Sequence, residues 1–126
     1  MTVKGKHILV VDDEPLLVRL NKRQLENAGY TVSVSTASLE ALEMLSKALG
    51  KYSLLLTDLT MPGLSGLELI RKVRLQLPDL PVIVLTGMSD PETEGHLYDL
   101  GVKDVVIKPL LEDELLAAVS KVLGGK

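Results

Sequence analysis

Polar side chains stand at the ends of short apolar segments, and their types are those that carry phosphate and metal chemistry. They are three aspartates, a threonine and a lysine: Asp12, Asp13, Asp58, Thr86 and Lys108. Carboxylate oxygens favour Mg2+ or Mn2+, and magnesium commonly binds one or two carboxylates together with phosphate oxygens. A carboxylate can also be a nucleophile, and an ammonium or a hydroxyl can donate to phosphate oxygens. The set predicts phosphoryl chemistry at a divalent-metal site.

Each of these residues also has a purely structural explanation when it is taken alone. Asp13 or Thr86 could cap a helix, and Asp58 could simply end a strand. A single lysine is usually a solvated surface residue. Three crowded carboxylates, in contrast, would repel one another unless a cation compensated their charge. The functional interpretation therefore depends on whether the fold brings the five residues together.

The elements that must position these residues are visible in the hydrophobic pattern. Four continuous apolar runs are too short for helices and predict buried parallel strands, at Ile8–Val11, Leu54–Leu56, Val82–Leu85 and Val105–Ile107. The segment Thr31–Ser35 alternates polar and apolar residues, which predicts a strand at a sheet edge.

Amphipathic helical patterns separate the predicted strands. They cover residues 17–28, 41–49, 69–77, 91–100 and 111–122, and Gly29, Gly50 and Gly101 stand where helices should end in a left-handed cap. The pattern over 91–100 is the weakest and the best candidate for a mobile element, because Gly95 interrupts it and it offers few large apolar side chains.

Five successive strand–helix units predict one α/β domain over residues 1–126. Right-handed crossovers place helices on both faces of a parallel sheet. The common five-stranded form is a doubly wound, flavodoxin-like (βα)5 three-layer sandwich with strand order 2-1-3-4-5, and its ligands bind beyond the carboxyl ends of strands 1 and 3. Asp12, Asp13 and Asp58 follow those two strands.

Composition excludes several other classes of function. A hydrophobic fraction of 46% with 25% charged residues is typical of a globular domain, and no segment approaches the about 20 apolar residues of a membrane span. The first six residues lack the apolar region of a signal peptide, so we expect a cytoplasmic domain without membrane contact. No cysteine is available for disulfides or zinc. A net charge of -3 and three tyrosines without Phe or Trp argue against direct nucleic-acid binding.

Four motifs in sequence order resemble the response-regulator receiver family of two-component signalling. They are Val10–Pro15, then Thr57–Gly63 with Ser65-Gly66, then Thr86-Gly87, and finally Gly101–Asp104 followed by Lys108-Pro109. The resemblance covers essentially the whole chain. It implies a switch that catalyses its own phosphorylation and dephosphorylation rather than a metabolic enzyme.

The resemblance also implies a role for each site residue. Asp58 would take a phosphoryl group from a phosphohistidine of a histidine kinase or histidine phosphotransfer protein. Asp13, Asp58 and the backbone carbonyl of Thr60 would bind Mg2+ directly, with Asp12 acting through water. Lys108 would pair with the phosphoryl group, and Thr86 would move to hydrogen-bond it. Apart from the resemblance, an X-Pro bond at a strand end can be cis, and a cis Lys108-Pro109 bond would aim the lysine inward.

One position departs from the family pattern, three residues before the lysine. The family commonly has Tyr or Phe there, and its ring follows the movement of the threonine, whereas this chain has Val105. A β-branched aliphatic side chain cannot provide that swinging ring. Tyr98 on the preceding helix could in principle replace the missing aromatic ring as a mobile surface residue. We favour the simpler interpretation, in which Tyr98 is a partly buried helix residue. Thr60 and Met88 occupy positions that border the attacking water, and the apolar Met88 predicts slow hydrolysis.

Other functions fit less well but stay open. In a flavin-binding protein of this topology, Asp12-Asp13-Glu14 would repel the flavin phosphate. An aspartyl phosphohydrolase would need two aspartates separated by one residue after its first strand, and this chain lacks that pattern. A receiver-fold interaction module that is never phosphorylated is the main alternative. The chain could be a stand-alone regulator or, as we slightly favour, the receiver segment of a hybrid sensor histidine kinase. The oligomeric state is open.

Overall fold

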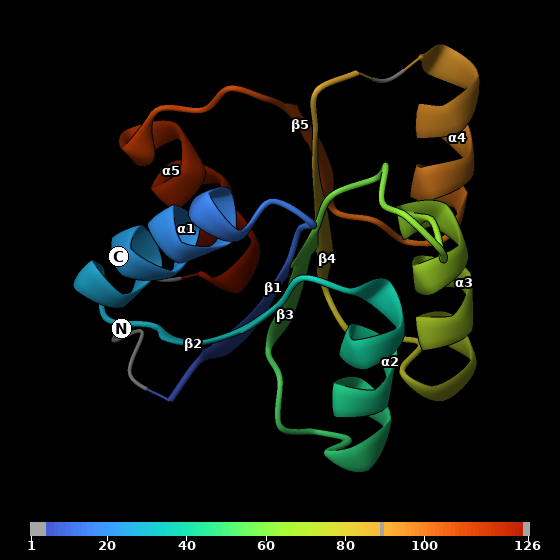
Figure 1. Ribbon diagram of the computed structural model, residues 1–126, viewed down its shortest axis with the longest axis horizontal. Coiled ribbons are helices and arrows are strands. Elements are labelled where there is room, and N and C mark those ends of the chain that lie inside the picture. Colours follow the sequence, from blue (N-terminus) through green and yellow to red (C-terminus); the bar gives the residue numbers. More distant parts are fainter. Residues whose placement is uncertain (1–4, 89, 125–126) are drawn as a thin grey trace.

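The computed structural model describes residues 5–88 and 90–124, which alternate strictly between strands and helices (Figure 1). The strands are β1 (His7–Val11), β2 (Thr31–Ser35), β3 (Leu54–Thr57), β4 (Val82–Thr86) and β5 (Asp104–Ile107). The helices are α1 (Pro15–Asn27), α2 (Ser38–Lys47), α3 (Gly66–Gln76), α4 (Pro91–Asp99) and α5 (Glu112–Leu123). Residues 1–4 lie outside the described part, so the expectation about a signal peptide is untested.

The five strands form one parallel sheet in the order β2-β1-β3-β4-β5, as predicted. β2 is an edge strand, which agrees with its alternating sequence and with its partly exposed Thr31, Ser33 and Val34. β3 and β4 are each one residue longer than their apolar runs at the carboxyl end. Thr86 is consequently the last residue of β4, whereas the sequence suggested that it follows the strand.

Two apolar layers cover the sheet, as Figure 1 shows with α1 and α5 on one face and α2, α3 and α4 on the other. Alternate residues of each strand point to opposite faces. Ile8 and Val10 therefore pack with α1 and α5, whereas Leu9 and Val11 pack with the other three helices. This three-layer packing holds every strand end in a fixed register.

Helix ends follow the chemistry of the sequence. Gly29, Gly50 and Gly101 have φ of 103°, 87° and 83°, so each adopts the left-handed conformation that the sequence predicted after a helix. α4 buries only Leu97, in keeping with its weak apolar pattern. Among the described residues, no helix is both long and apolar enough to cross a membrane.

Candidate functional site

The predicted site residues gather at the carboxyl edge of the sheet. Asp12 and Asp13 directly follow β1, Asp58 follows β3 and Lys108 follows β5, while Thr86 ends β4. The parallel register brings these ends side by side, because Val11 pairs with Thr57 and Thr86 pairs with Ile107.

The three aspartates form a compact oxygen-rich cluster. One carboxylate oxygen from each of Asp12, Asp13 and Asp58 lies within 4.8 Å of the other two. Asp12 and Asp58 are 3% and 7% exposed, whereas Asp13 faces solvent. Buried like charges at this spacing need a counterion. A donor set of carboxylates open to water on one side fits a hard divalent cation such as Mg2+.

Lys108 supplies the positive charge that neutralises part of the cluster. Its Nζ lies 2.7 Å from Asp12 Oδ2 and 3.4 Å from Asp58 Oδ2, and its side chain is only 17% exposed. Burial alone would lower the pKa of Lys108, but the hydrogen bond and charge of Asp12, reinforced by Asp58, outweigh it and raise the pKa above the ordinary value. The lysine is therefore held protonated between two carboxylates.

The peptide bond that follows this lysine is cis, as the sequence allowed for. In the same turn, the Lys108 amide donates to the Thr86 carbonyl at 2.8 Å, which continues the pairing of β4 with β5. Lys108 is thus anchored by its backbone to β4 and by its side chain to Asp12.

Backbone amides fix the two buried carboxylates. The Leu59 amide donates to Asp58 Oδ1 at 2.7 Å, and the Glu14 amide donates to Asp12 Oδ1 at 3.0 Å. In each case the Oδ2 atom faces Lys108. Asp13 does not cap α1, because the N-cap residue is Glu14 and no side chain caps that helix. The aspartates are thus explained by the site rather than by helix capping.

Thr86 is buried at the same edge of the sheet, and its hydroxyl is bonded to Met88. Its Oγ1 donates to the carbonyl oxygen of Met88 at 2.9 Å and accepts from the Met88 amide at 3.4 Å. The threonine hydroxyl therefore holds the backbone at the start of the β4–α4 loop. The Met88 side chain is 82% exposed, so its predicted influence on water attack stays a prediction.

The loop between β3 and α3 carries Thr60, which is exposed two residues beyond Asp58. The base of this loop is tight, because a Cβ added to Gly66 would lie 2.3 Å from the Asp58 carbonyl oxygen and 2.7 Å from Leu59 Cα. The Gly66 amide donates to the Leu59 carbonyl across the same contact, at 2.8 Å. Sequence reasoning noted Gly66 only as part of a motif and missed this close approach of two backbone segments.

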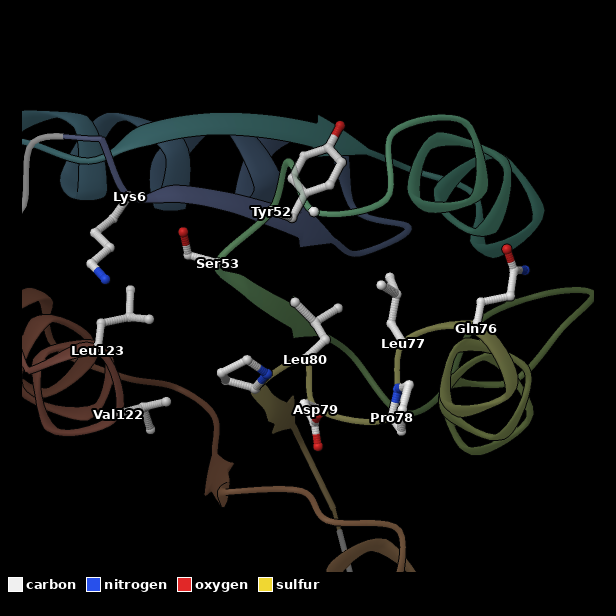
Figure 2. Close-up of a pocket in the computed structure, with 12 residues that line it drawn as sticks. Lys6, Tyr52, Ser53, Gln76, Leu77, Pro78, Asp79, Leu80, Val122 and Leu123 are labelled. Carbon is white, nitrogen blue, oxygen red and sulfur yellow. The ribbon is translucent and has the colours of Figure 1, made fainter.

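A hollow lies at the amino ends of the strands, opposite the candidate site. Figure 2 shows its walls, which include Lys6 before β1, Ser53 before β3 and Leu80 before β4, together with Val122 and Leu123 of α5. Its lining holds one carboxylate, that of Asp79. This hollow therefore has neither the acidic cluster nor the paired lysine of the carboxyl edge.

Comparison with known proteins supports the assignment made from this geometry. The model of the response regulator receiver domain family matches residues 8–120. The chain belongs to the response-regulator receiver family. This receiver domain has the fold and the phosphoacceptor-switch role of that family, in two-component signalling.

Relatives and solved structures agree with this membership. The receiver domain is 39% identical over 117 residues to the uncharacterized transcriptional regulatory protein YkoG of Bacillus subtilis, covering 93% of this chain and 50% of that protein. It is 35% identical over 117 residues to the response regulator ArlR of Staphylococcus aureus, covering 92% and 52%. The chain thus spans about half the length of the curated relatives it matches.

The solved structures match almost end to end. The response regulator TrrA of Thermotoga maritima, in complex with Mg2+-BeF, superposes with a TM-score of 0.83 at 36% identity, covering 94% of this chain and 99% of that one. The chemotaxis protein CheY4 of Vibrio cholerae gives a TM-score of 0.87 at 28% identity, covering 94% and 98%.

Within this receiver domain, Val105 occupies the position where the family commonly has an aromatic ring. Val105 pairs with Val84 in the sheet and packs, partly buried, against the layer of α2, α3 and α4. The next position along the same face is Ile107, which is 49% exposed and pairs directly with Thr86. Tyr98 on α4 is 47% exposed. An aliphatic strand surface therefore adjoins Thr86 in this protein.

Proposed function

We propose that Asp58 is the phosphoryl acceptor of this receiver domain and that Asp12, Asp13, Thr86 and Lys108 assist it. The observation that carries the proposal is the lysine bridge, in which one partly buried ammonium contacts both Asp12 and Asp58 beside the exposed Asp13. Such an arrangement costs desolvation energy that packing alone does not require. It is well suited to binding a dianionic phosphoryl group and a metal at the same edge.

The transfer follows from the chemistry of the acceptor. A carboxylate oxygen of Asp58 attacks the phosphorus of a phosphohistidine, forming an O–P bond as the N–P bond breaks, and the histidine nitrogen keeps the electron pair and takes up a proton. Lys108 is placed to shift from Asp12 and Asp58 towards the new phosphoryl oxygens. Thr86 would exchange the Met88 carbonyl for a phosphoryl oxygen.

The residues that would hold the metal are Asp13, Asp58 and the carbonyl of Thr60, with Asp12 acting through water. When bound, Mg2+ would neutralise charge on the phosphoryl oxygens. The complex of the similar TrrA with Mg2+-BeF supports a magnesium site in this domain. Hydrolysis of the aspartyl phosphate would return the domain to its resting state, and Met88 would affect the rate of that step.

The partner would be a histidine kinase or a histidine phosphotransfer protein, and residues 1–126 would act as one receiver unit. The alternative function, a receiver-fold interaction module without phosphorylation, requires that Asp58 stay unmodified under phosphorylating conditions.

The decisive experiment is incubation with Mg2+ and acetyl phosphate, followed by intact-mass measurement. We expect a single phosphate adduct on the wild type and none on Asp58→Asn. Asp99→Asn, at an exposed aspartate of α4, is the matched control and should form the adduct. An unmodified wild type, both with acetyl phosphate and with a phosphorylated kinase, would favour the interaction module.

A further inference from the structure

α2 contributes a hydrogen bond to the loop that follows Asp58. The Ser38 hydroxyl donates to the carbonyl oxygen of Leu64 at 2.6 Å, across 26 positions of sequence. Ser38 is 2% exposed and is the first residue of α2, while Leu64 lies near the end of the loop between β3 and α3. The bond ties the first turn of α2 to the loop that carries Thr60.

This loop has few other internal supports. Thr60, Pro62 and Gly63 are exposed, and Gly63 has φ of 77°, so its middle is an open turn. The Met61 side chain is buried at 7% exposure, and the base is closed by the Gly66 amide bonded to the Leu59 carbonyl. In the returning half of the loop, Ser65 is bonded to Glu68 at the start of α3, and the Ser38 bond restrains Leu64 just before it.

The same turn of α2 is also connected to the strand end that bears Asp12. The Asp12 amide donates to the Ser35 carbonyl at 3.2 Å, and the Ser35 hydroxyl donates to Glu40 of α2 at 2.6 Å. The first turn of α2 is therefore bonded directly to the β3–α3 loop and, through Ser35 of β2, to the backbone of Asp12.

We infer that Ser38 is a positioning residue for the metal site, which holds the β3–α3 loop so that the Thr60 carbonyl can reach an ion bound by Asp13 and Asp58. The inference rests on the proposed function and adds a residue to it that does not touch the ion. Mg2+ demands near-ideal octahedral geometry. Residues that orient metal ligands commonly change metal affinity about 10–100-fold when they are removed.

The test compares Ser38→Ala with Ser46→Ala. Alanine is a stronger helix former than serine, so α2 should persist in both variants. Ser46 lies on the same helix and accepts a hydrogen bond from Gln76 of α3 at 2.9 Å, so its bond is to α3 and not to the β3–α3 loop. In metal-free protein, hydrogen exchange should be faster over residues 59–65 in Ser38→Ala alone.

Mg2+ titration followed by backbone-amide NMR shifts provides the second measurement. We expect Ser38→Ala to bind Mg2+ about tenfold more weakly than the wild type, with Ser46→Ala unchanged. Saturating Mg2+ should restore phosphate-adduct formation by Ser38→Ala, because the nucleophile and Lys108 are untouched.

The possible failures are distinguishable. A wild type that binds Mg2+ while Ser38→Ala binds it equally well would overturn this inference and leave the proposed function intact. Unchanged exchange of the loop would also overturn it. A wild type that binds no Mg2+ would overturn both.

Discussion

Lys108 is the residue on which the electrostatics of the site depend. Its ammonium sits between Asp12 and Asp58 and is mostly shielded from water. A bound divalent cation would interact with the same carboxylates, so the lysine and the metal compete for negative charge in the resting state. Phosphoryl transfer to Asp58 adds negative charge at the cluster, and the lysine can then pair with the new phosphoryl oxygens. Binding of metal and uptake of phosphate should therefore respond differently to loss of this lysine.

Lys108→Gln is expected to bind Mg2+ as tightly as the wild type or more tightly. It is expected to form the aspartyl phosphate about tenfold more slowly. The reason is that the substitution removes a competing cation in the resting state and a phosphoryl partner in the transition state. Mg2+ titration and the time course of adduct mass measure the two effects. Lys121→Gln, at an exposed lysine of α5, is the control. Loss of Mg2+ binding in Lys108→Gln would contradict this account.

His7 at the start of β1 should make stability depend on pH. Its Nε2 lies 2.7 Å from Ser33 Oγ, and its ring meets the Tyr52 ring edge-on at 4.8 Å. Burial, with the nearby charge of Lys51, lowers the pKa of His7 below its ordinary 6.5. The unfolded chain therefore takes up a proton at higher pH than the folded chain. Stability from this residue is present above pH 6.5 and is lost as pH falls through the folded pKa.

Urea unfolding of the wild type and His7→Gln at several pH values tests this expectation. The wild type should lose more stability than His7→Gln as pH falls below 6.5. His96→Gln, at an exposed histidine of α4, should behave like the wild type. Identical pH slopes for the wild type and His7→Gln would count against the assignment.

At the scale of elements, the carboxyl edge depends on how loops and helix ends are tied to the body. Arg74 of α3 ties such segments together at the opposite edge of the sheet, where β4 begins and α4 ends. Its guanidinium donates to the carbonyls of Leu77 and Leu80 before β4, and to those of Leu100 and Gly101 after α4. Burial lowers the pKa of Arg74, and the Asp79 carboxylate opposes that shift. One side chain thus joins α3, the segment before β4 and the end of α4.

Arg74→Met should lower the free energy of unfolding by about 2–3 kcal/mol, because carbonyls would lose hydrogen bonds from a charged donor. Urea denaturation followed by circular dichroism gives the value. Arg71→Met, at an exposed arginine of the same helix, should change stability by less than about 0.5 kcal/mol. Equal stabilities of the two variants would show that Arg74 does not anchor α4.

Two glycines should respond in opposite ways to alanine. Gly66→Ala forces a Cβ against the backbone of Asp58 and Leu59, so the variant should lose roughly 1–3 kcal/mol of stability and form the phosphate adduct more slowly. Gly95 of α4 has open space for a Cβ, and Gly95→Ala should gain up to about 1 kcal/mol. Thermal unfolding and adduct mass are the measurements. A harmless Gly66→Ala would mean that the loop can move away without cost.

At the scale of the whole molecule, a resident acidic cluster links folding to metal binding. The three carboxylates oppose folding when no cation is present and favour it when one binds only the folded state. Lys108 offsets part of this repulsion without removing it, since Asp13 contributes a further charge at the open side of the cluster. Stability should therefore depend on Mg2+ concentration.

Mg2+ at about 100 times its dissociation constant should stabilise the wild type by about 2.7 kcal/mol relative to protein in EDTA. Asp13→Asn removes a charge from the cluster, so it should equal or exceed the wild type in EDTA yet gain less from Mg2+. Melting curves at graded Mg2+ concentrations test both statements. A melting temperature of the wild type that does not respond to Mg2+ would argue against a metal site.

The sequence by itself determined the five strand–helix units, the strand order and the residues of the candidate site. It could do so because short apolar runs, amphipathic periods and glycine caps are local signals, and because parallel strands must place their carboxyl ends at one edge. Asp12, Asp58 and Lys108 were predictable as neighbours for that reason. The sequence placed Thr86 just after its strand, whereas it is the last residue of β4 and pairs with Ile107. A polar residue at a strand end can still be paired within the sheet.

Only the tertiary structure decided which atoms meet. The pairing of Lys108 with Asp12 more closely than with Asp58 and the Ser38–Leu64 bond join segments that are distant in sequence. Within one loop, the structure also leaves no room for a Cβ at Gly66 beside the Asp58 carbonyl. Such contacts arise from how the helices pack on the sheet, which no local pattern encodes. They determine how firmly the acceptor aspartate and its loop are held, and hence how the site is tuned.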